Sequence, residues 1–162
     1  MALNESVRIT ADPLATAYLE QNIIYHGEIH VPVLTLHTTG DGLVEVENES
    51  AYNDVVREHG NGPLLRRTFV ARAGHCAFTP AETIVAVETL LGRMDTGKWP
   101  ELAASDLNAS ASSLGPELNV FTNAQGALVE VLPAFVDFYP APYLRPFNGD
   151  GECKDFPWCN SF

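Results

Sequence analysis

Two apolar runs in the first half of the chain predict strands. Residues 31–37, Val-Pro-Val-Leu-Thr-Leu-His, are almost continuously apolar, which is typical of a strand buried on both faces. Residues 64–71, Leu-Leu-Arg-Arg-Thr-Phe-Val-Ala, predict a second strand. Residues 50–59 between them have helical spacing, and the Gly-Asn-Gly-Pro sequence at 60–63 ends that helix. A strand, a helix and a strand in this order predict a βαβ unit with parallel strands.

Two further helices are predicted from their start signals. Asp12 followed by Pro13 fits an N-cap and a first helical position, and it predicts a short helix within residues 12–26. Thr79-Pro80-Ala81-Glu82 is a capping box, and it predicts a helix that Gly97 ends. Apolar residues at helical spacing indicate the buried face of this second helix: Ile84, Val87, Leu90, Leu91 and Met94.

The pattern changes after Trp99. Residues 100–117 are rich in Ala, Ser, Asn and Gly, so we predict a linker or loop there. Residues 118–138 contain two apolar stretches around a turn sequence, which predicts a β-hairpin, and a tail rich in proline and aromatics follows. The expected organisation is thus an α/β domain over residues 1–99, a linker at 100–117 and an extension at 118–162.

Candidate chemistry lies directly after each predicted strand. Asp41 follows the first strand and His75 follows the second. Loops at the carboxyl ends of neighbouring parallel strands meet at one edge of a sheet, where α/β proteins place reactive groups. A carboxylate beside the imidazole would hold one tautomer and stabilise the imidazolium that forms when histidine takes a proton. We therefore expect Asp41 and His75 to act as acid and base.

These segments resemble a known family. The run from Val31 to Asp41 is similar to the strand and acid turn of α/β-hydrolases, Ala73-Gly74-His75-Cys76-Ala77-Phe78 resembles their histidine loop, and Thr79 to Gly97 resembles their final helix. The likeness covers residues 23–99 and keeps the family's order of acid before histidine. It implies a partial α/β-hydrolase sheet of βαβα type, with Asp41 and His75 as catalytic residues of a serine esterase and no cofactor.

The nucleophile of that family is missing from the sequence. No Gly-x-Ser-x-Gly occurs, and none of the serines has the flanking glycines that a nucleophile elbow needs. Cys76 adjoins the base, so we expect it to be a buried small residue that points away from His75. The chain is therefore expected to be the C-terminal segment of an ester hydrolase, inactive alone and completed by a serine-bearing half. The alternative is a non-catalytic homologue or binding protein.

Other interpretations of the candidate residues stay open. Asp41 lies in Gly-Asp-Gly, a common turn sequence, so Glu45 and Glu47 are alternative acids. His37 ends a strand and is more readily explained as structural. A zinc site built from His37, Asp41 and His75 would use suitable ligands, but the spacing matches no compact metal motif, and we predict no metal.

Charge and cysteines bound the partners and the compartment. The net charge of −12 disfavours nucleic acid and anionic membranes as partners. Cys153 and Cys159 are spaced for a small disulfide loop, and together with Asn-x-Ser sequons at Asn4, Asn48 and Asn108 they fit a secreted parent protein. Two free thiols, or a bond from Cys76 to either, are the alternatives. The first strand would lack a neighbour on one side, which predicts self-association through its edge.

Overall fold

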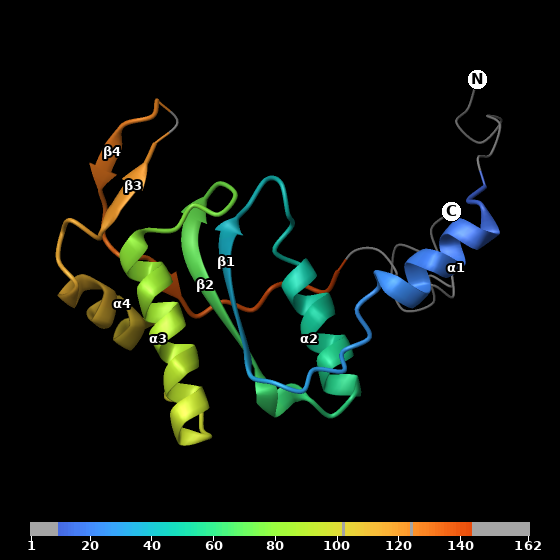
Figure 1. The fold of residues 1–162 in the computed structure, drawn as a ribbon. Helices are drawn as coiled ribbons and strands as arrows, with labels where there is room; N and C mark the ends of the chain where they lie inside the picture. The colour runs from blue at the N-terminus through green and yellow to red at the C-terminus, as the bar shows by residue number, and fades with distance from the viewer. Residues whose placement is uncertain (1–9, 102, 124, 144–162) are drawn as a thin grey trace.

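The computed structural model of the protein describes residues 10–101, 103–123 and 125–143. The helices and strands follow one another in this order: α1 (Pro13–Asn22), β1 (Val33–Gly40), α2 (Asn48–Glu58), β2 (Leu65–Ala73), α3 (Pro80–Thr96), α4 (Ala104–Ser113), β3 (Val120–Thr122), β4 (Leu128–Glu130) and β5 (Phe135–Val136). The result is a mixed α/β protein (Figure 1). Within the described ranges, no helix has the length and apolar character needed to span a bilayer.

A small open sheet organises the molecule. β1 and β2 are parallel neighbours with Val33 opposite Leu65 and His37 opposite Phe69, which confirms the predicted βαβ unit. β5 pairs antiparallel with the other edge of β2, so the order is β1-β2-β5. β1 is therefore an edge strand among the described residues. The open sheet of a mixed α/β protein, expected from the sequence, is present. The α/β-hydrolase fold itself stays a prediction.

Helices lie on both faces of this sheet. α2 flanks one face, and α3 and α4 pack together on the other (Figure 1). The core between the sheet, α3 and α4 is built from Val70, Ala81, Val85, Ala104, Leu107, Ala111 and Phe135. Residues far apart in the sequence, from Val70 in β2 to Phe135 in β5, therefore share this core.

Helix α4 corrects the prediction of a linker at residues 100–117. Its buried residues, Ala104, Leu107 and Ala111, recur at helical spacing and face the core. Asn108 fixes the helix to β5, since its side-chain amide donates to the carbonyl of Phe135 and accepts from the N–H of the same residue, both at 2.8 Å. The low content of large apolar residues concealed this helix, because alanine is small yet the best helix former.

Helix α3 has the predicted ends but a different buried face. The capping box of Thr79 and Glu82 is present, and Gly97 ends the helix in the left-handed conformation. The residues that α3 buries are Ala81, Glu82, Val85, Ala86 and Thr89. Val87, Leu91 and Met94 are instead more than half exposed, at 52%, 51% and 62%. Small residues on the buried face leave room for α4, which also packs through alanines.

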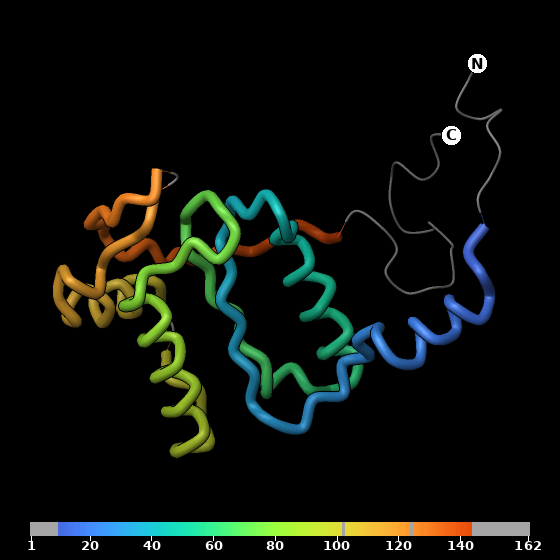
Figure 2. The backbone as a smooth tube through the Cα atoms, turned by 45° about the horizontal axis from the view of Figure 1, so that its top comes forward, coloured from blue at the N-terminus to red at the C-terminus, as the bar shows by residue number. Residues whose placement is uncertain are grey.

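Helix α1 and the β3–β4 hairpin extend away from this core (Figure 1). Asp12 caps α1 through its side chain, as predicted, but the helix ends at Asn22 and buries none of its residues. In Figure 2, α1 leads away from the sheet on the side of α2. β3 and β4 form the predicted hairpin, although it is shorter than the apolar stretches suggested. Phe135 and Val136, which the hairpin prediction included, instead form β5.

Candidate functional site

The loops that follow β1 and β2 are joined directly to each other. The hydroxyl of Thr38 donates to the carbonyl of Gly74 at 2.7 Å, and the N–H of Gly74 donates to the carbonyl of Gly40 at 3.0 Å. Gly40 lies opposite Ala73, where a Cβ would be 3.2 Å from the Ala73 Cα. The absence of a side chain at Gly40 therefore lets the two strand ends approach closely, and the loops lie side by side in Figures 1 and 2.

Asp41 begins the first loop and is held at both carboxylate oxygens. Its Oδ1 accepts from the N–H groups of Leu43 and Val44 at 2.8 and 3.0 Å, and its Oδ2 lies 2.8 Å from Nδ1 of His75. The side chain is only 4% exposed. The N–H of Val44 is the largest influence on its pKa, burial opposes it, and Leu43 and His75 assist, so the pKa falls from 3.8 to about 2. Asp41 is thus a carboxylate at neutral pH.

This carboxylate determines the tautomer of His75. An ionised Asp41 can only accept, so Nδ1 of His75 must carry the proton of their shared hydrogen bond. Nε2 of the neutral ring is then left as a proton acceptor. The His75 side chain is 44% exposed, so the imidazole ring is partly open to solvent. The structure thus brings together the two residues that the sequence suggested, in the arrangement that orients a general base.

The position of Cys76 differs from the prediction. Cys76 is exposed rather than buried, and its Sγ lies 3.5 Å from Nε2 of His75 rather than pointing away. Its backbone has φ 51°, a conformation that residues other than glycine seldom adopt. The expectation for Cys76 was wrong because neighbouring side chains were taken to diverge, and no sequence pattern indicates this backbone conformation.

A buried ion pair between β2 and α3 holds the loop that carries His75. Arg72, in β2, makes two hydrogen bonds of 2.7 and 3.0 Å with Glu82 of α3, and it donates to the carbonyl of Ala77 at 2.7 Å. Glu82 also accepts from the N–H groups of Thr79 and Ala134. The pair therefore fixes both sides of the loop that carries His75. The capping box drew attention to Glu82, whereas Arg72 gave no signal in the sequence.

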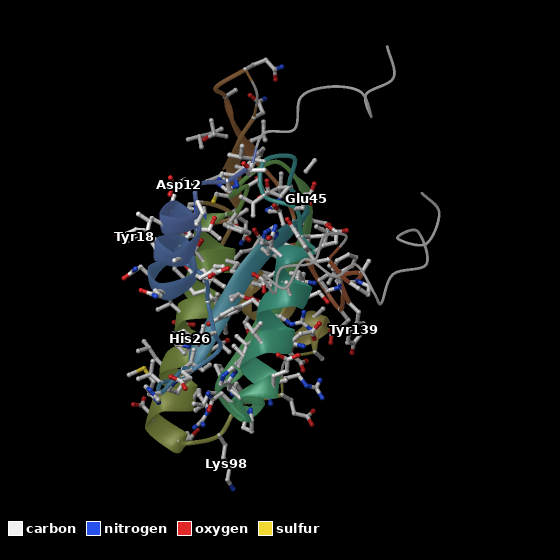
Figure 3. The ribbon with its side chains drawn as sticks, turned by 90° about the vertical axis from the view of Figure 1, so that its right-hand side faces the viewer. Asp12, Tyr18, His26, Glu45, Lys98 and Tyr139 are labelled. Atoms are coloured by element: carbon white, nitrogen blue, oxygen red, sulfur yellow. The ribbon has the colours of Figure 1, made fainter. Side chains whose placement is uncertain are left out.

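The alternative acids and ligands are not gathered at this site. Among the described residues, the carboxylate that bonds to His75 is that of Asp41, and neither Glu45 nor Glu47 does so. Figure 3 shows Glu45 in the loop after β1, at the opposite end of the molecule from Lys98. His37 directs Nδ1 to the carbonyl of Thr38. Within the described ranges, no three His, Cys, Asp or Glu side chains converge in a way that would hold a metal ion.

The remaining sequence expectations concern the cysteines near the end of the sequence, the three sequons and the serines. Cys153, Cys159 and the sequon at Asn4 lie outside the described residues. Asn48 is exposed, but the amide of Asn108 is committed to β5 on both of its polar atoms, so that sequon is not free to carry a glycan as folded. Among the described serines, none forms a hydrogen bond with His75.

Comparison with known proteins gives one informative similarity. The chain is 40% identical over 120 residues to the o-phthalyl amidase of Xanthobacter agilis, and the match covers 71% of this chain and 26% of the amidase. The chain thus spans about a quarter of the length of that relative. No family model matches the sequence, and no solved structure matches it. The chain therefore has a hydrolase-type relative, an amidase, and the similarity between the two extends over most of this chain.

Proposed function

We propose that this chain carries the acid and base of a serine hydrolase that cleaves carboxylic esters or amides. The observation that carries the proposal is the 2.8 Å hydrogen bond between a buried Asp41 carboxylate and Nδ1 of a half-exposed His75. In a protein whose relative is an amidase, that pair is the part of a hydrolytic site that moves protons. The serine nucleophile comes from polypeptide outside this sequence.

The chemistry follows from Nε2 of His75, which the Asp41 hydrogen bond leaves as a proton acceptor. The nitrogen takes the serine proton as the oxygen forms its bond to the acyl carbon, and Asp41 stabilises the imidazolium that results. The imidazolium then returns the proton to the leaving alcohol or amine as the bond between the acyl carbon and that group breaks. Water repeats the sequence on the acyl-enzyme. The sequence resemblance favours esters, and the name of the relative favours amides, so both substrate classes belong in the test.

Exposed apolar surfaces offer a place for the serine-bearing region. β1 has a free edge among the described residues. Val87, Leu91 and Met94 form an exposed stripe along α3. On the side of α2, an apolar groove of about 590 Å³ runs between that helix, β1 and the segment at 23–25, and Val33, Val44 and Val55 contribute to its walls. Unpaired strand edges and apolar patches of this kind are normally covered by further structure.

The test joins this chain to its serine-bearing region, found by reading the genomic DNA upstream of Met1 for Gly-x-Ser-x-Gly. A fluorophosphonate probe should label that serine in the joined protein and leave the isolated chain unlabelled. Turnover of a nitrophenyl ester and of the matched anilide should fall by about 10⁴-fold in His75→Ala and in Asp41→Asn. His30→Ala is the control, because His30 is exposed and precedes β1, at the other end of that strand from Asp41. Unchanged turnover in His75→Ala would reject the proposal.

A non-catalytic binding protein is the second candidate. The exposed α3 stripe and the free edge of β1 favour it, because both are surfaces for a partner whether or not a serine is present. Fluorophosphonate labelling of the joined protein distinguishes the two candidate functions. A joined protein that is folded but neither labelled nor active supports binding alone, whereas probe labelling that depends on His75 supports the hydrolase.

A further inference from the structure

The thiol of Cys76 lies beside Nε2 of His75, the nitrogen that would take the proton of the proposed serine. Its Sγ is 3.5 Å from Nε2 of His75, within hydrogen-bonding range for sulfur, and the residue is exposed. His75 is in turn bonded through Nδ1 to Asp41. A nucleophile within reach of a base, with that base oriented by a third group, is the arrangement that activates a side chain for covalent catalysis.

The direction of the proton in this arrangement follows from Asp41. Since the carboxylate accepts from Nδ1–H, the neutral ring presents Nε2 as an acceptor, and the Cys76 S–H is the donor beside it. Transfer of that proton gives a thiolate next to an imidazolium. Asp41, held by the N–H groups of Leu43 and Val44, stays ionised and stabilises the positive ring. The thiolate is the nucleophilic form of cysteine.

The local backbone keeps the sulfur at the surface of the loop. Gly74 precedes His75 and has φ 110°, and Cys76 follows His75 and has φ 51°. These two positive φ values turn the chain sharply on either side of His75. The N–H of Phe78 donates to the carbonyl of Cys76 at 2.9 Å, and the next residue, Ala77, is buried and held by Arg72. The thiol is therefore fixed on a supported turn and open to small reagents.

We propose that Cys76 is a nucleophile in its own right, which takes acyl groups from activated esters with His75 as its base and Asp41 as the orienting carboxylate. In the first step His75 accepts the thiol proton and sulfur forms a bond to the acyl carbon. The C–O bond then breaks, its electron pair leaves with the alkoxide or phenolate, and the imidazolium gives its proton to that leaving group, which returns His75 to the neutral form. In the second step water attacks the thioester, gives a proton to His75, and the thiolate departs and recovers that proton.

This inference rests on the same Asp41–His75 pair as the proposed function but needs no serine. It is tested on the full chain alone with p-nitrophenyl acetate. We expect one acetyl group per chain by intact mass, placed on Cys76 by peptide mapping. Nitrophenolate should appear as a burst of one equivalent, followed by slower release as the thioester is hydrolysed. Cys76→Ala should lose both signals. Nitrophenolate release that persists in Cys76→Ala would mean that a group other than Cys76 is responsible, and it would overturn the proposal.

The role of the base is read from rates. Acetylation of Cys76 should be slowed by about 10²-fold in His75→Gln and clearly slowed in Asp41→Asn, with His30→Ala unchanged. A second measurement needs no variant: iodoacetamide at pH 7 should alkylate Cys76 at least about tenfold faster in the folded chain than in the same chain unfolded in urea. Equal rates in both comparisons would overturn the proposal, even if a variant folds poorly.

Failure here and failure of the proposed function give different results. If Cys76 proves unreactive, fluorophosphonate labelling of a serine in the joined protein still supports the proposed function. A joined protein without serine labelling, in turn, leaves the acetylation of Cys76 as a separate finding on the isolated chain.

Discussion

Asp41 shows how local backbone geometry prepares a side chain for chemistry. One of its oxygens receives two backbone N–H groups from the turn that it begins, and the other receives Nδ1–H of His75. A carboxylate with this many donors stays charged although it is 4% exposed. The turn role and the acid role of the Gly-Asp-Gly sequence, which the sequence presented as alternatives, are thus compatible in the structure.

The low pKa of Asp41 predicts a pH dependence of stability. The carboxyl has a pKa of about 2 in the folded chain against 3.8 as its ordinary value, so the unfolded chain binds this proton more readily. The contribution of Asp41 to the free energy of unfolding is therefore complete above about pH 4 and is lost as the pH falls towards about 2. Urea unfolding should show a steeper decline across this interval for the native sequence than for Asp41→Asn. Parallel curves would remove Asp41 as the cause.

The residues of the candidate site were predictable to different degrees. Asp41 and His75 could be placed because each follows an apolar strand, and parallel pairing brings such strand ends together. Cys76 could not be placed, because the direction of its side chain depends on a positive φ that no sequence pattern specifies. Arg72 is one of three arginines in β2 and lies just beyond the strand predicted at residues 64–71, and its partner Glu82 becomes apparent only when α3 packs on β2.

At the level of elements, the Arg72–Glu82 pair joins three parts of the chain. Glu82 is fully buried, and its four hydrogen bonds come from two Arg72 nitrogens, the N–H of Thr79 and the N–H of Ala134. The pair thereby connects β2, the start of α3 and the segment that leads into β5. Arg72 is also only 13% exposed, so both charges depend on one another for solvation.

Replacing Glu82 by Gln should destabilise the protein strongly. The amide keeps the volume but turns an acceptor into an NH₂ group that faces N–H donors, and it leaves the Arg72 charge unpaired. Breaking a buried pair on one side costs about 3–5 kcal/mol. Glu88→Gln is the matched control, because Glu88 lies on the exposed side of the same helix and should change the free energy of unfolding by less than about 0.5 kcal/mol. Equal values for the two variants in urea would contradict this account.

The elements also mark the limits of prediction from sequence. Caps and turn residues are local signals, so the ends of α3, the N-cap of α1 and the β3–β4 turn could be placed. Which face of α3 is buried depends on α4, and the Ala-rich segment of α4 has no large apolar stripe of its own. The expectation for Val87, Leu91 and Met94 was wrong because size alone was taken to decide which residues become buried.

For the whole molecule, the contrast between charge and apolar surface is the central feature. The chain has a net charge of −12, yet it exposes the α3 stripe and leaves the edge of β1 unpaired among the described residues. Mutual repulsion at this charge opposes association, while apolar burial and strand pairing favour it. Repulsion between exposed charges is screened by salt, with a range of about 10 Å at 0.1 M, whereas apolar attraction is not. The balance should therefore shift with ionic strength.

Self-association of the isolated chain should accordingly increase with both concentration and salt. Sedimentation velocity at low salt and at about 0.5 M NaCl, where the screening range is only a few ångströms, should show a larger fraction of dimer or higher species at high salt. Leu91→Glu should weaken association by adding a charge to the α3 stripe. Leu128→Glu is the matched control, because Leu128 is 70% exposed on β4, outside that stripe, and adds the same charge. Equal effects of the two variants would assign the change to net charge alone, and a monomer at every concentration and salt would show that the free edge and the stripe are tolerated without a partner.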